Sequence, residues 1–296
     1  MTLPSTDTVV TYPSGATTSA GTLLHTEPLD GGRLAVVLDL TACHPVDSAW
    51  PDQGADHATL SVDGVSFEVL DCVVGATDGT ALYLGADVPV RKGTEGWAFV
   101  VVHIIESDAA AISEGASAQI VVDPGYRHAL SVGHTACHLA SLALNAQLAG
   151  AWTKEVTADA YGNPNFDALA IETSTIGENR SVDVYRLGKS LRKKGFTPAT
   201  LTDDVAGVTS GIDERLAGWV ASAADARVAT DGDTLTSRRY WQTELDGIAI
   251  SIPCGGTHVA SLSEFESVTV GLEVDDSGSA IEVRMTTEAA LVRPNR

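Results

Sequence analysis

Lysine is scarce in this sequence, and basic residues are few in general. Five of the 296 residues are Lys, and Lys and Arg together number 18 against 39 Asp and Glu, so the formal net charge is −21 at pH 7. Because a surface this acidic repels DNA and anionic membranes, we expect neither as a partner. The charge favours solubility, or life at high salt, and it leaves room for one local basic site.

Cysteine is also rare. The four residues Cys43, Cys72, Cys137 and Cys254 are too few and too scattered for the disulfide framework of a small secreted protein. Long apolar runs are missing as well, since the most apolar stretch, residues 97–105, has nine residues, whereas a membrane-spanning helix needs about 20. The first residues carry no basic segment followed by an apolar run, so they do not predict a signal peptide. Reduced thiols and a cytoplasmic location are therefore expected.

Apolar residues are plentiful enough for a sizeable core. They make up 44% of the chain and charged residues 19%, and the length corresponds to about two domains. In the first part, short apolar runs follow one another without a long helix, and Asp63-Gly64 between two such runs predicts a hairpin. Residues 1–108 are therefore expected to form an N-terminal domain that is β-barrel-like.

The second part mixes helices with strands. Apolar residues recur at helical spacing over residues 127–150 and 202–227, and strand-like runs lie between and after them. Gly133 falls inside the first predicted helix, where a glycine lets another backbone approach closely. Residues 109–296 are therefore predicted to form an α+β domain with an antiparallel sheet and two main helices, which places the whole chain in the α+β class.

Two short motifs carry metal-binding residues. HTACH places His134 and His138 four residues apart, so on a helix both imidazoles lie on one face, one turn apart. CGGTH supplies Cys254 and His258, and its two glycines predict a loop that lets thiolate and imidazole converge. Three histidines and one cysteine form a tetrahedral N₃S donor set that suits Zn²⁺. We therefore predict a metal-binding second domain that holds one zinc ion per chain.

The two motifs resemble those of the editing domain of alanyl-tRNA synthetase and of its free-standing relatives, the AlaX-type trans-editing proteins. HTACH is similar to the family's HTATH-type motif, and PCGGTH is similar to its CGGTH motif. Arg127 lies seven residues before His134, where the family commonly carries arginine. Gln53 and Asp56 match the family's Gln-x-x-Asp-x-Gly pattern, whereas the final glycine of that pattern and the glycines before it are replaced.

This resemblance implies an editing-like domain that removes wrongly attached Ser or Gly from alanine tRNA in trans. Such a protein is a zinc-dependent aminoacyl-tRNA deacylase of translation quality control, and mischarged alanine tRNA is its partner. Because the aminoacyl ester is labile, a metal ion and a positioned water suffice for hydrolysis. Two alternatives stay open: a metal-dependent hydrolase of a small ester or amide unrelated to tRNA, and a non-catalytic zinc-stabilised binding module.

Beyond the metal and its water, the sequence assigns no catalytic residue. The candidates for substrate binding are Gln53, Thr135, Gly255, Gly256 and Thr257. Their amide, hydroxyl and backbone N–H groups can hydrogen-bond a substrate, although each also has a structural explanation in a turn or a cap.

The remaining cysteines and one histidine are expected to serve packing. Cys137 points about 100° away from the neighbouring His138 on a helix, so packing is favoured over metal binding. Cys43, Cys72 and His103 lie in strand-like segments and are expected in the core.

One dense basic cluster stands out in the acidic chain. It consists of Lys189, Arg192, Lys193 and Lys194. These side chains are candidates for binding tRNA phosphates, and a solvated turn is the alternative. The sequence leaves open which amino acid and which tRNA are recognised, whether the metal activates water or anchors substrate, and the oligomeric state.

Overall fold

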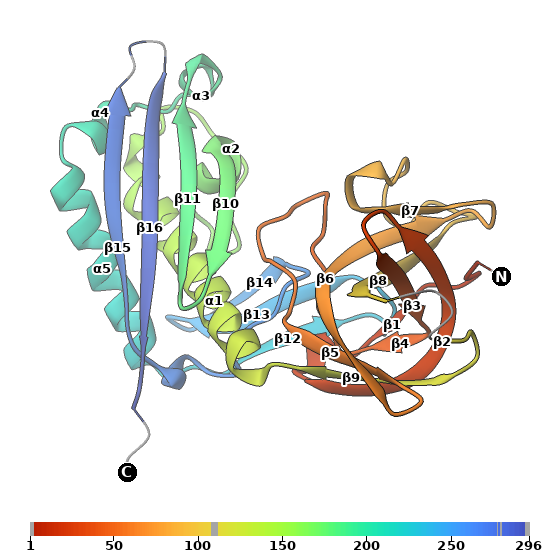
Figure 1. Cartoon of the computed structure of the whole chain (residues 1–296). Coiled ribbons are helices and arrows are strands. Elements are labelled where there is room, and N and C mark those ends of the chain that lie inside the picture. Colours follow the sequence, from red (N-terminus) through yellow and green to blue (C-terminus); the bar gives the residue numbers. More distant parts are fainter. Residues whose placement is uncertain (1–2, 108–111, 277, 279, 294–296) are drawn as a thin grey trace. The chain divides into compact units, whose positions relative to one another are not determined.

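The computed structural model describes residues 3–107, 112–276, 278 and 280–293 (Figure 1). Over these residues the chain separates into two compact units. The first comprises Met1–His128, Val228–Arg239 and Gly255–Thr257, and the second comprises Ala129–Arg227, Tyr240–Cys254 and His258–Arg296. The domain boundary expected between residues 108 and 109 lies outside the described residues.

The first unit is built almost entirely from strands. They are β1 (Val9–Val10), β2 (Thr18–Leu29), β3 (Arg33–Leu38), β4 (Leu40–Thr41), β5 (Ala58–Val62), β6 (Val65–Thr77), β7 (Leu82–Leu84), β8 (Ala98–Glu106) and β9 (Ser117–Val122). Two single-turn 3₁₀ helices, Tyr12–Ser14 and Gly85–Asp87, interrupt them.

Seven of these strands form one sheet in the order β5-β9-β2-β3-β8-β6-β7. Because β5 also pairs with β6, the hydrogen-bonded order returns to its start and the strands follow a ring. The hairpin predicted at Asp63-Gly64 is confirmed, since it joins β5 to β6 and both residues have positive φ, 50° and 82°. Two consecutive positive φ values match the twist of antiparallel strands, which is why Asp-Gly is favoured there.

The second unit combines helices with two sheets. Its helices are α1 (Pro124–Gln147, which starts in the first unit), α2 (Phe166–Ala170), α3 (Lys189–Lys193), α4 (Ala199–Thr202) and α5 (Val205–Ala221). Its strands are β10 (Ile171–Gly177), β11 (Arg180–Leu187), β12 (Ala226–Thr230), β13 (Arg239–Leu245), β14 (Ile248–Pro253), β15 (Phe265–Asp276) and β16 (Ile281–Leu291). Short 3₁₀ turns occupy Ala149–Ala151 and Leu262–Glu264.

Four of these strands form an antiparallel sheet in the order β10-β11-β16-β15, and β12, β13 and β14 form a second sheet. The two long helices are α1 and α5, as expected. The α+β class is confirmed, with a mostly antiparallel arrangement of strands. In the described part of the chain, no helix is both long enough and apolar enough to cross a membrane.

Helix α1 begins and ends three residues earlier than the sequence suggested, at Pro124 and Gln147 rather than at residues 127 and 150. The carboxylate of Asp123 accepts hydrogen bonds from the backbone N–H groups of Gly125 (2.8 Å) and Tyr126 (3.1 Å). Proline fits the first turn because it has no N–H to leave unpaired. Asp123 and Pro124 therefore form a start signal that apolar periodicity does not reveal.

Gly133 lets helix α1 touch the turn between β10 and β11. A Cβ atom at this position would lie 2.3 Å from the carbonyl oxygen of Gly177 and 2.6 Å from that of Arg180. Both obstacles are backbone atoms, so they cannot rotate away as a side chain would. The close approach expected at this glycine is confirmed, and it fixes the part of α1 that precedes His134.

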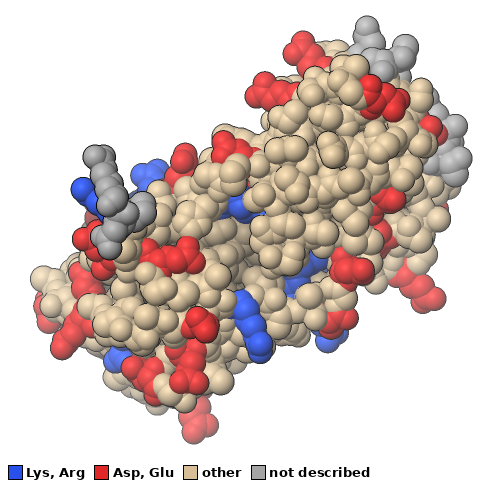
Figure 2. Space-filling model, turned by 90° about the horizontal axis from the view of Figure 1, so that it is seen from below, with Lys and Arg blue, Asp and Glu red and all other residues tan. Residues whose placement is uncertain are grey.

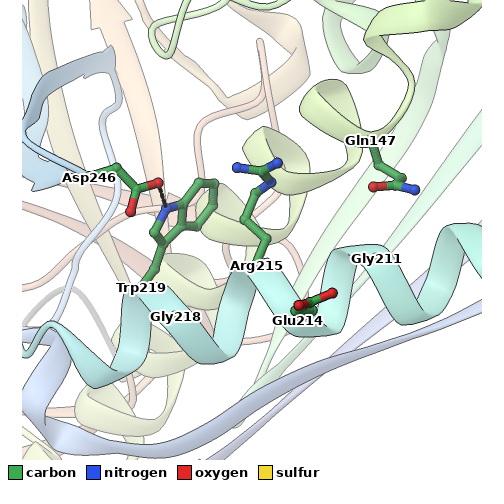
Figure 3. A pocket seen from close by; sticks show the side chains of 7 residues that line it. All are labelled: Gln147, Gly211, Glu214, Arg215, Gly218, Trp219 and Asp246. Atoms are coloured by element: carbon green, nitrogen blue, oxygen red, sulfur yellow. Dashed lines mark hydrogen bonds between the residues drawn. The ribbon is translucent and has the colours of Figure 1, made fainter.

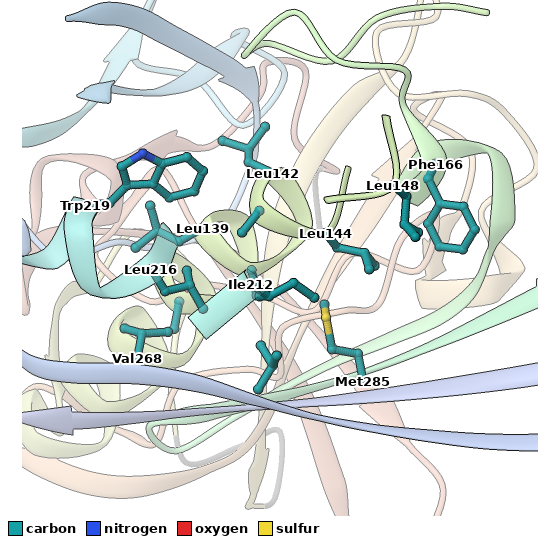
Figure 4. Packing of buried hydrophobic residues seen from close by; sticks show 14 of the residues in the cluster. Leu139, Leu142, Leu144, Leu148, Phe166, Ile212, Leu216, Trp219, Val268 and Met285 are labelled. Atoms are coloured by element: carbon teal, nitrogen blue, oxygen red, sulfur yellow. The ribbon is translucent and has the colours of Figure 1, made fainter. Parts of the chain in front are cut away.

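The core of the second unit lies between α1, α5 and the larger sheet (Figure 4). Leu139 and Leu142 of α1, Ile212 and Leu216 of α5, and Met285 of β16 all belong to this buried cluster (Figure 4). Burying a side chain of this size contributes about 1.5–3 kcal/mol. This packing makes α1 a rigid platform for the histidines that it carries.

Candidate metal centre

Helix α1 and one loop bring together the four residues of the two motifs. His134 and His138 project from successive turns of α1, and Cys254 and His258 lie in the loop that follows β14. One donor atom from each residue lies within 4.8 Å of every other. All four belong to the second unit, and together they form a group that could hold a metal ion.

The spacing of the donor atoms is close to that of a metal site. The Cys254 sulfur lies 3.3 Å from Nε2 of His134 and 3.2 Å from Nε2 of His258. In a tetrahedral zinc site, ligand atoms lie about 3.3–3.8 Å apart, as follows from zinc–nitrogen and zinc–sulfur bonds of about 2.0–2.3 Å. Little movement is therefore needed for these atoms to enclose an ion.

Thr135 orients one of the imidazoles. Its hydroxyl donates to the carbonyl of Ser131 (2.8 Å), accepts from the backbone N–H of Val259 (3.2 Å) and lies 3.2 Å from Nδ1 of His258. Because that hydroxyl hydrogen is used by Ser131, Nδ1 of His258 is the donor and Nε2 keeps its lone pair. Histidine ligands of metals are commonly held in this way through their second nitrogen. The proposed contact of Thr135 with substrate stays a prediction.

His138 presents an unsatisfied acceptor to the cluster. Its Nε2 atom is buried and has no hydrogen-bond partner among the described residues. Burial lowers the pKa of His138 to about 4, so the imidazole is neutral near pH 7 and its lone pair is free. The ring is stacked near Trp241, with centroids 5.3 Å apart. A buried nitrogen without a partner costs free energy unless an ion or another donor meets it, so the donor set fits a metal.

Cys137 lies apart from this cluster, as expected. Its sulfur is 3.6 Å from both carboxylate oxygens of Asp183. Burial, followed by the charge of Asp183, raises the pKa of the Cys137 thiol well above its usual value. A protonated thiol in this position serves packing and hydrogen bonding.

Gln53 is held by the CGGTH loop. The backbone N–H of Thr257 donates to Oε1 of Gln53 (3.0 Å), and Nε2 of Gln53 donates to the Thr257 hydroxyl (3.0 Å). Both residues belong to the first unit and are buried. Since Thr257 directly precedes His258 in the chain, Gln53 restrains the loop that carries two of the four clustered residues. The predicted role of Gln53 and Thr257 in substrate binding stays a prediction.

Asp56 and Arg127 form a buried ion pair within the first unit. Nε of Arg127 donates to Asp56 over 2.6 Å, and a terminal nitrogen donates to the carbonyl of Ala42 over 2.8 Å. Asp56 also accepts from the backbone N–H of His44 (2.5 Å). These contacts tie three separate segments together, so the Gln-x-x-Asp pattern and the upstream arginine position the loop of Gln53.

The two glycines of the CGGTH loop differ in exposure. Gly255 is exposed, a Cβ atom there would meet nothing within 4 Å, and its φ lies outside the left-handed region. Gly256 is buried. A side chain at Gly255 would therefore fit the local backbone. Because the residue is glycine, the backbone next to Cys254 is not covered by a side chain. Binding of a substrate by either N–H stays a prediction.

The basic cluster is larger than the sequence suggested. Lys189, Arg192, Lys193 and Lys194 lie on and directly after helix α3, and all four are exposed. The ammonium of Lys154 donates to the carbonyl of Lys193 over 2.8 Å and so joins them. Four of the five lysines of the chain therefore gather at one place. Lys154 is far from the others in sequence, so only the fold could reveal it. Acidic side chains, by contrast, are spread over the face shown in Figure 2.

A shallow pocket beside α5 was not expected from the sequence (Figure 3). Its volume is about 290 Å³, and Gln147, Arg215, Trp219 and Asp246 are among its lining residues. The indole N–H of Trp219 donates to Asp246 over 2.8 Å (Figure 3). Tyr161 donates to the same oxygen over 2.6 Å. Asp246 therefore has a structural role in this pocket, as the hydrogen-bond acceptor of two aromatic side chains.

A second group of cysteine and histidine side chains lies inside the first unit. Donor atoms of Cys43, Cys72 and His103 also lie within 4.8 Å of one another, and all three residues are buried as expected. These residues lie far apart in the sequence and belong to no common motif, so their proximity was not predicted. Burial raises the pKa of the Cys72 thiol well above its usual value.

No protein-family model matches the chain, and no curated protein matches its sequence. The function must therefore be argued from the site itself.

Proposed function

We propose that this protein is a zinc-dependent hydrolase that removes wrongly attached Ser or Gly from alanine tRNA in trans, in the cytoplasm. The observation that carries the proposal is the convergence of HTACH and CGGTH on one point. These motifs lie far apart in sequence, yet His134, His138, Cys254 and His258 present three nitrogens and one sulfur to a common centre. The proposal includes a barrel-like form for the N-terminal ring of strands and an editing-like second domain.

The donor set favours zinc among the common metals. Neutral imidazoles and one thiolate suit a borderline-soft ion, whereas calcium and magnesium prefer oxygen ligands. A bound zinc ion would supply Lewis-acid chemistry that polarises an ester carbonyl and strengthens water as a nucleophile. One ion per chain is expected at this centre.

The chain's own residues would hold and present the ester. Thr135 fixes the His258 ring, and the Gln53–Thr257 hydrogen bonds restrain the backbone just before it. Gly255 is exposed and follows Cys254 directly in sequence, and its N–H is proposed to donate to the carbonyl oxygen as charge develops on it. Gln53 and Thr257 are proposed to contact the aminoacyl group.

The basic cluster on α3 is proposed to bind the phosphates of the tRNA. Its four exposed cations and Lys154 form a local positive site on an acidic protein. Binding of this kind weakens as salt concentration rises, because phosphate contacts release counterions.

The deciding experiment measures release of labelled serine from alanine tRNA charged with serine. Alanine tRNA charged with alanine is the control substrate, and a chelated sample is run beside the zinc-loaded protein. We expect chelator-sensitive release of serine and no release of alanine. His138→Ala should abolish release, whereas Cys137→Ala, which changes the neighbouring side chain outside the cluster, should preserve it.

Failure of this experiment has a defined meaning. If zinc occupies the centre fully and neither amino acid is released, the proposed substrate is wrong. Turnover of simple esters in that case would identify a small-molecule hydrolase. Unfolding on chelation without any ester turnover would identify a zinc-stabilised binding module.

A further inference from the structure

A second potential metal site lies among strands of the first unit. Cys72 of β6 stands directly opposite His103 of β8 in the antiparallel ladder. Cys43 follows β4 and brings its thiol to the same place, so that the three donor atoms lie within 4.8 Å of one another. Each of the three residues has 0% of its surface exposed to solvent. None of them belongs to the HTACH or CGGTH motif.

The hydrogen bonds of His103 leave one of its ring nitrogens with a lone pair. Nδ1 of His103 lies 3.2 Å from the carbonyl oxygen of Val36, which can only accept, so Nδ1 carries the hydrogen. Nε2 therefore keeps its lone pair, and it lies 2.9 Å from the hydroxyl of Thr41. Metal-binding histidines typically donate their second nitrogen to a backbone carbonyl in this manner. The same hydroxyl accepts from the backbone N–H of Cys43 (3.1 Å), which holds Cys43 beside the ring.

The charge of the donor set selects the kind of ion. Two thiolates and one neutral imidazole carry a charge of −2, which a divalent cation cancels. Neutrality matters because the surroundings are apolar: the cysteines pack in the core cluster of this unit with Val36, Leu38, Val74 and Val101. An uncompensated charge in such a place is costly. Sulfur and nitrogen donors favour a soft or borderline ion such as zinc over calcium or magnesium.

We propose that Cys43, Cys72 and His103 bind a second soft divalent cation, with zinc as the ordinary occupant, and that this ion has a structural role inside the first unit. Binding would release the two thiol protons to solvent, and the lone pair of His103 would turn from the Thr41 hydroxyl to the ion. The hydroxyl oxygen of Thr41, 2.9 Å from Nε2 of His103, is a candidate fourth donor. The proposal does not depend on the tRNA-editing function.

Burial predicts how this ion would differ from the one in the second unit. Cys254, His138 and His258 are only partly buried, whereas Cys43, Cys72 and His103 have no exposed surface. A chelator can reach the first group in the folded protein. It can reach the second group only when strands of the first unit separate.

The test counts metal in the full-length protein produced in zinc-containing medium. Elemental analysis should find two zinc ions per chain in the native protein. Dialysis of the folded protein against a strong chelator should remove one ion, and unfolding in denaturant with chelator should release the other. X-ray absorption of the zinc that remains after dialysis should show two sulfur ligands and one nitrogen ligand, in contrast to the single sulfur of the partly exposed centre.

Variants assign the retained ion. Cys43→Ala and Cys72→Ala should each lose the chelator-resistant zinc and keep the other ion. Cys137→Ala, a buried thiol outside both groups, should keep both ions, and His138→Ala should lose only the ion that the chelator reaches. If Cys43→Ala and Cys72→Ala do not fold, X-ray absorption of the zinc retained by the wild-type protein tests the proposal without them.

Three results would overturn the proposal. The first is a single zinc per chain that native dialysis removes completely. The second is a retained zinc that keeps only one sulfur ligand. The third is a mass, measured without reductant, that shows a disulfide between Cys43 and Cys72, since both thiols would then be consumed. None of these results bears on serine release, so the two proposals fail separately.

Discussion

The two units of this protein bury reactive side chains in opposite ways. In the second unit, His134, His138, Cys254 and His258 gather where a helix meets a glycine loop, and three of the four are only partly buried. In the first unit, Cys43, Cys72 and His103 are enclosed completely among strands. A similar set of nitrogen and sulfur donors is therefore partly open to solvent in one unit and closed to solvent in the other.

The units also differ in how they treat buried carboxylates. The first unit neutralises Asp56 with the guanidinium of Arg127. In the described part of the second unit, the half-buried carboxylate of Asp167 accepts a hydrogen bond from the neutral hydroxyl of Tyr185 over 2.9 Å. Burial raises the pKa of Asp167 to about 6. Ionisation of Asp167 as the pH rises through about 6 therefore lowers the stability of the second unit.

The largest expected effect comes from removing one of the four proposed ligands of the partly buried centre. In His138→Ala, zinc content should fall by one ion per chain and ester hydrolysis should fall to the level of the chelated sample, because the three remaining donors no longer close the N₃S set. Elemental analysis and serine release measure the two losses. Unchanged zinc content in this variant would remove His138 from the site.

Substitutions of Gly133 and Gly255 distinguish a glycine that the fold requires from one that the proposed activity requires. In Gly133→Ala, the new Cβ would strike two backbone carbonyls, so the free energy of unfolding should fall by about 3 kcal/mol or more. In Gly255→Ala, no atom obstructs the Cβ, and the free energy of unfolding should change by less than about 0.5 kcal/mol. Urea unfolding compares the two variants. Reduced serine release by the stable Gly255→Ala protein would support contact of this loop with substrate.

The pH dependence of stability tests whether folding disfavours the charged form of Asp167. The folded state raises the pKa of Asp167, so its favourable contribution is complete below the unfolded pKa of about 4 and is lost as pH rises through about 6. Asp167→Asn keeps an acceptor for Tyr185 without the charge. Relative to wild type, it should gain about 2–3 kcal/mol of unfolding free energy between about pH 4 and pH 8. Equal pH profiles for the two proteins would show that burial does not disfavour this carboxylate.

Loss of the hydroxyl that orients His258 should have a smaller effect. Thr135→Val removes the acceptor for Nδ1 of His258 and for the N–H of Val259. Zinc affinity should fall by about 10- to 100-fold, as for other residues that hold a metal ligand through its second nitrogen. Competition with a chelating dye measures the affinity. Thr135→Ser keeps the hydroxyl and should bind zinc as the wild type does.

The smallest expected effect concerns the basic cluster. Reversing the charges of Arg192 and Lys193 should weaken tRNA binding and lower the slope of log affinity against log salt by about two, because two phosphate contacts are lost. Zinc content should stay at the wild-type level in this double variant. The same change at the exposed residues Arg91 and Lys92 of the first unit is the matched control. Equal tRNA affinity in both double variants would exclude α3 as the phosphate site.

Local signals in the sequence were sufficient for much of the fold. Asp63-Gly64 predicted its hairpin because the turn geometry depends on those two residues alone. The spacing of His134 and His138 predicted a shared helix face for the same reason. The start of α1 was missed because the cap of Asp123 and Pro124 lies outside the apolar repeat.

The sequence by itself determined the α+β class, the two long helices and the residues of the HTACH and CGGTH motifs, since each depends on neighbours a few positions apart. Only the tertiary structure decided that Lys154 joins α3, that Thr135 orients His258, and that Cys43, Cys72 and His103 meet. Each of these contacts joins segments that lie far apart in the sequence. Pairing register is a property of the whole sheet, and no short stretch of sequence encodes it.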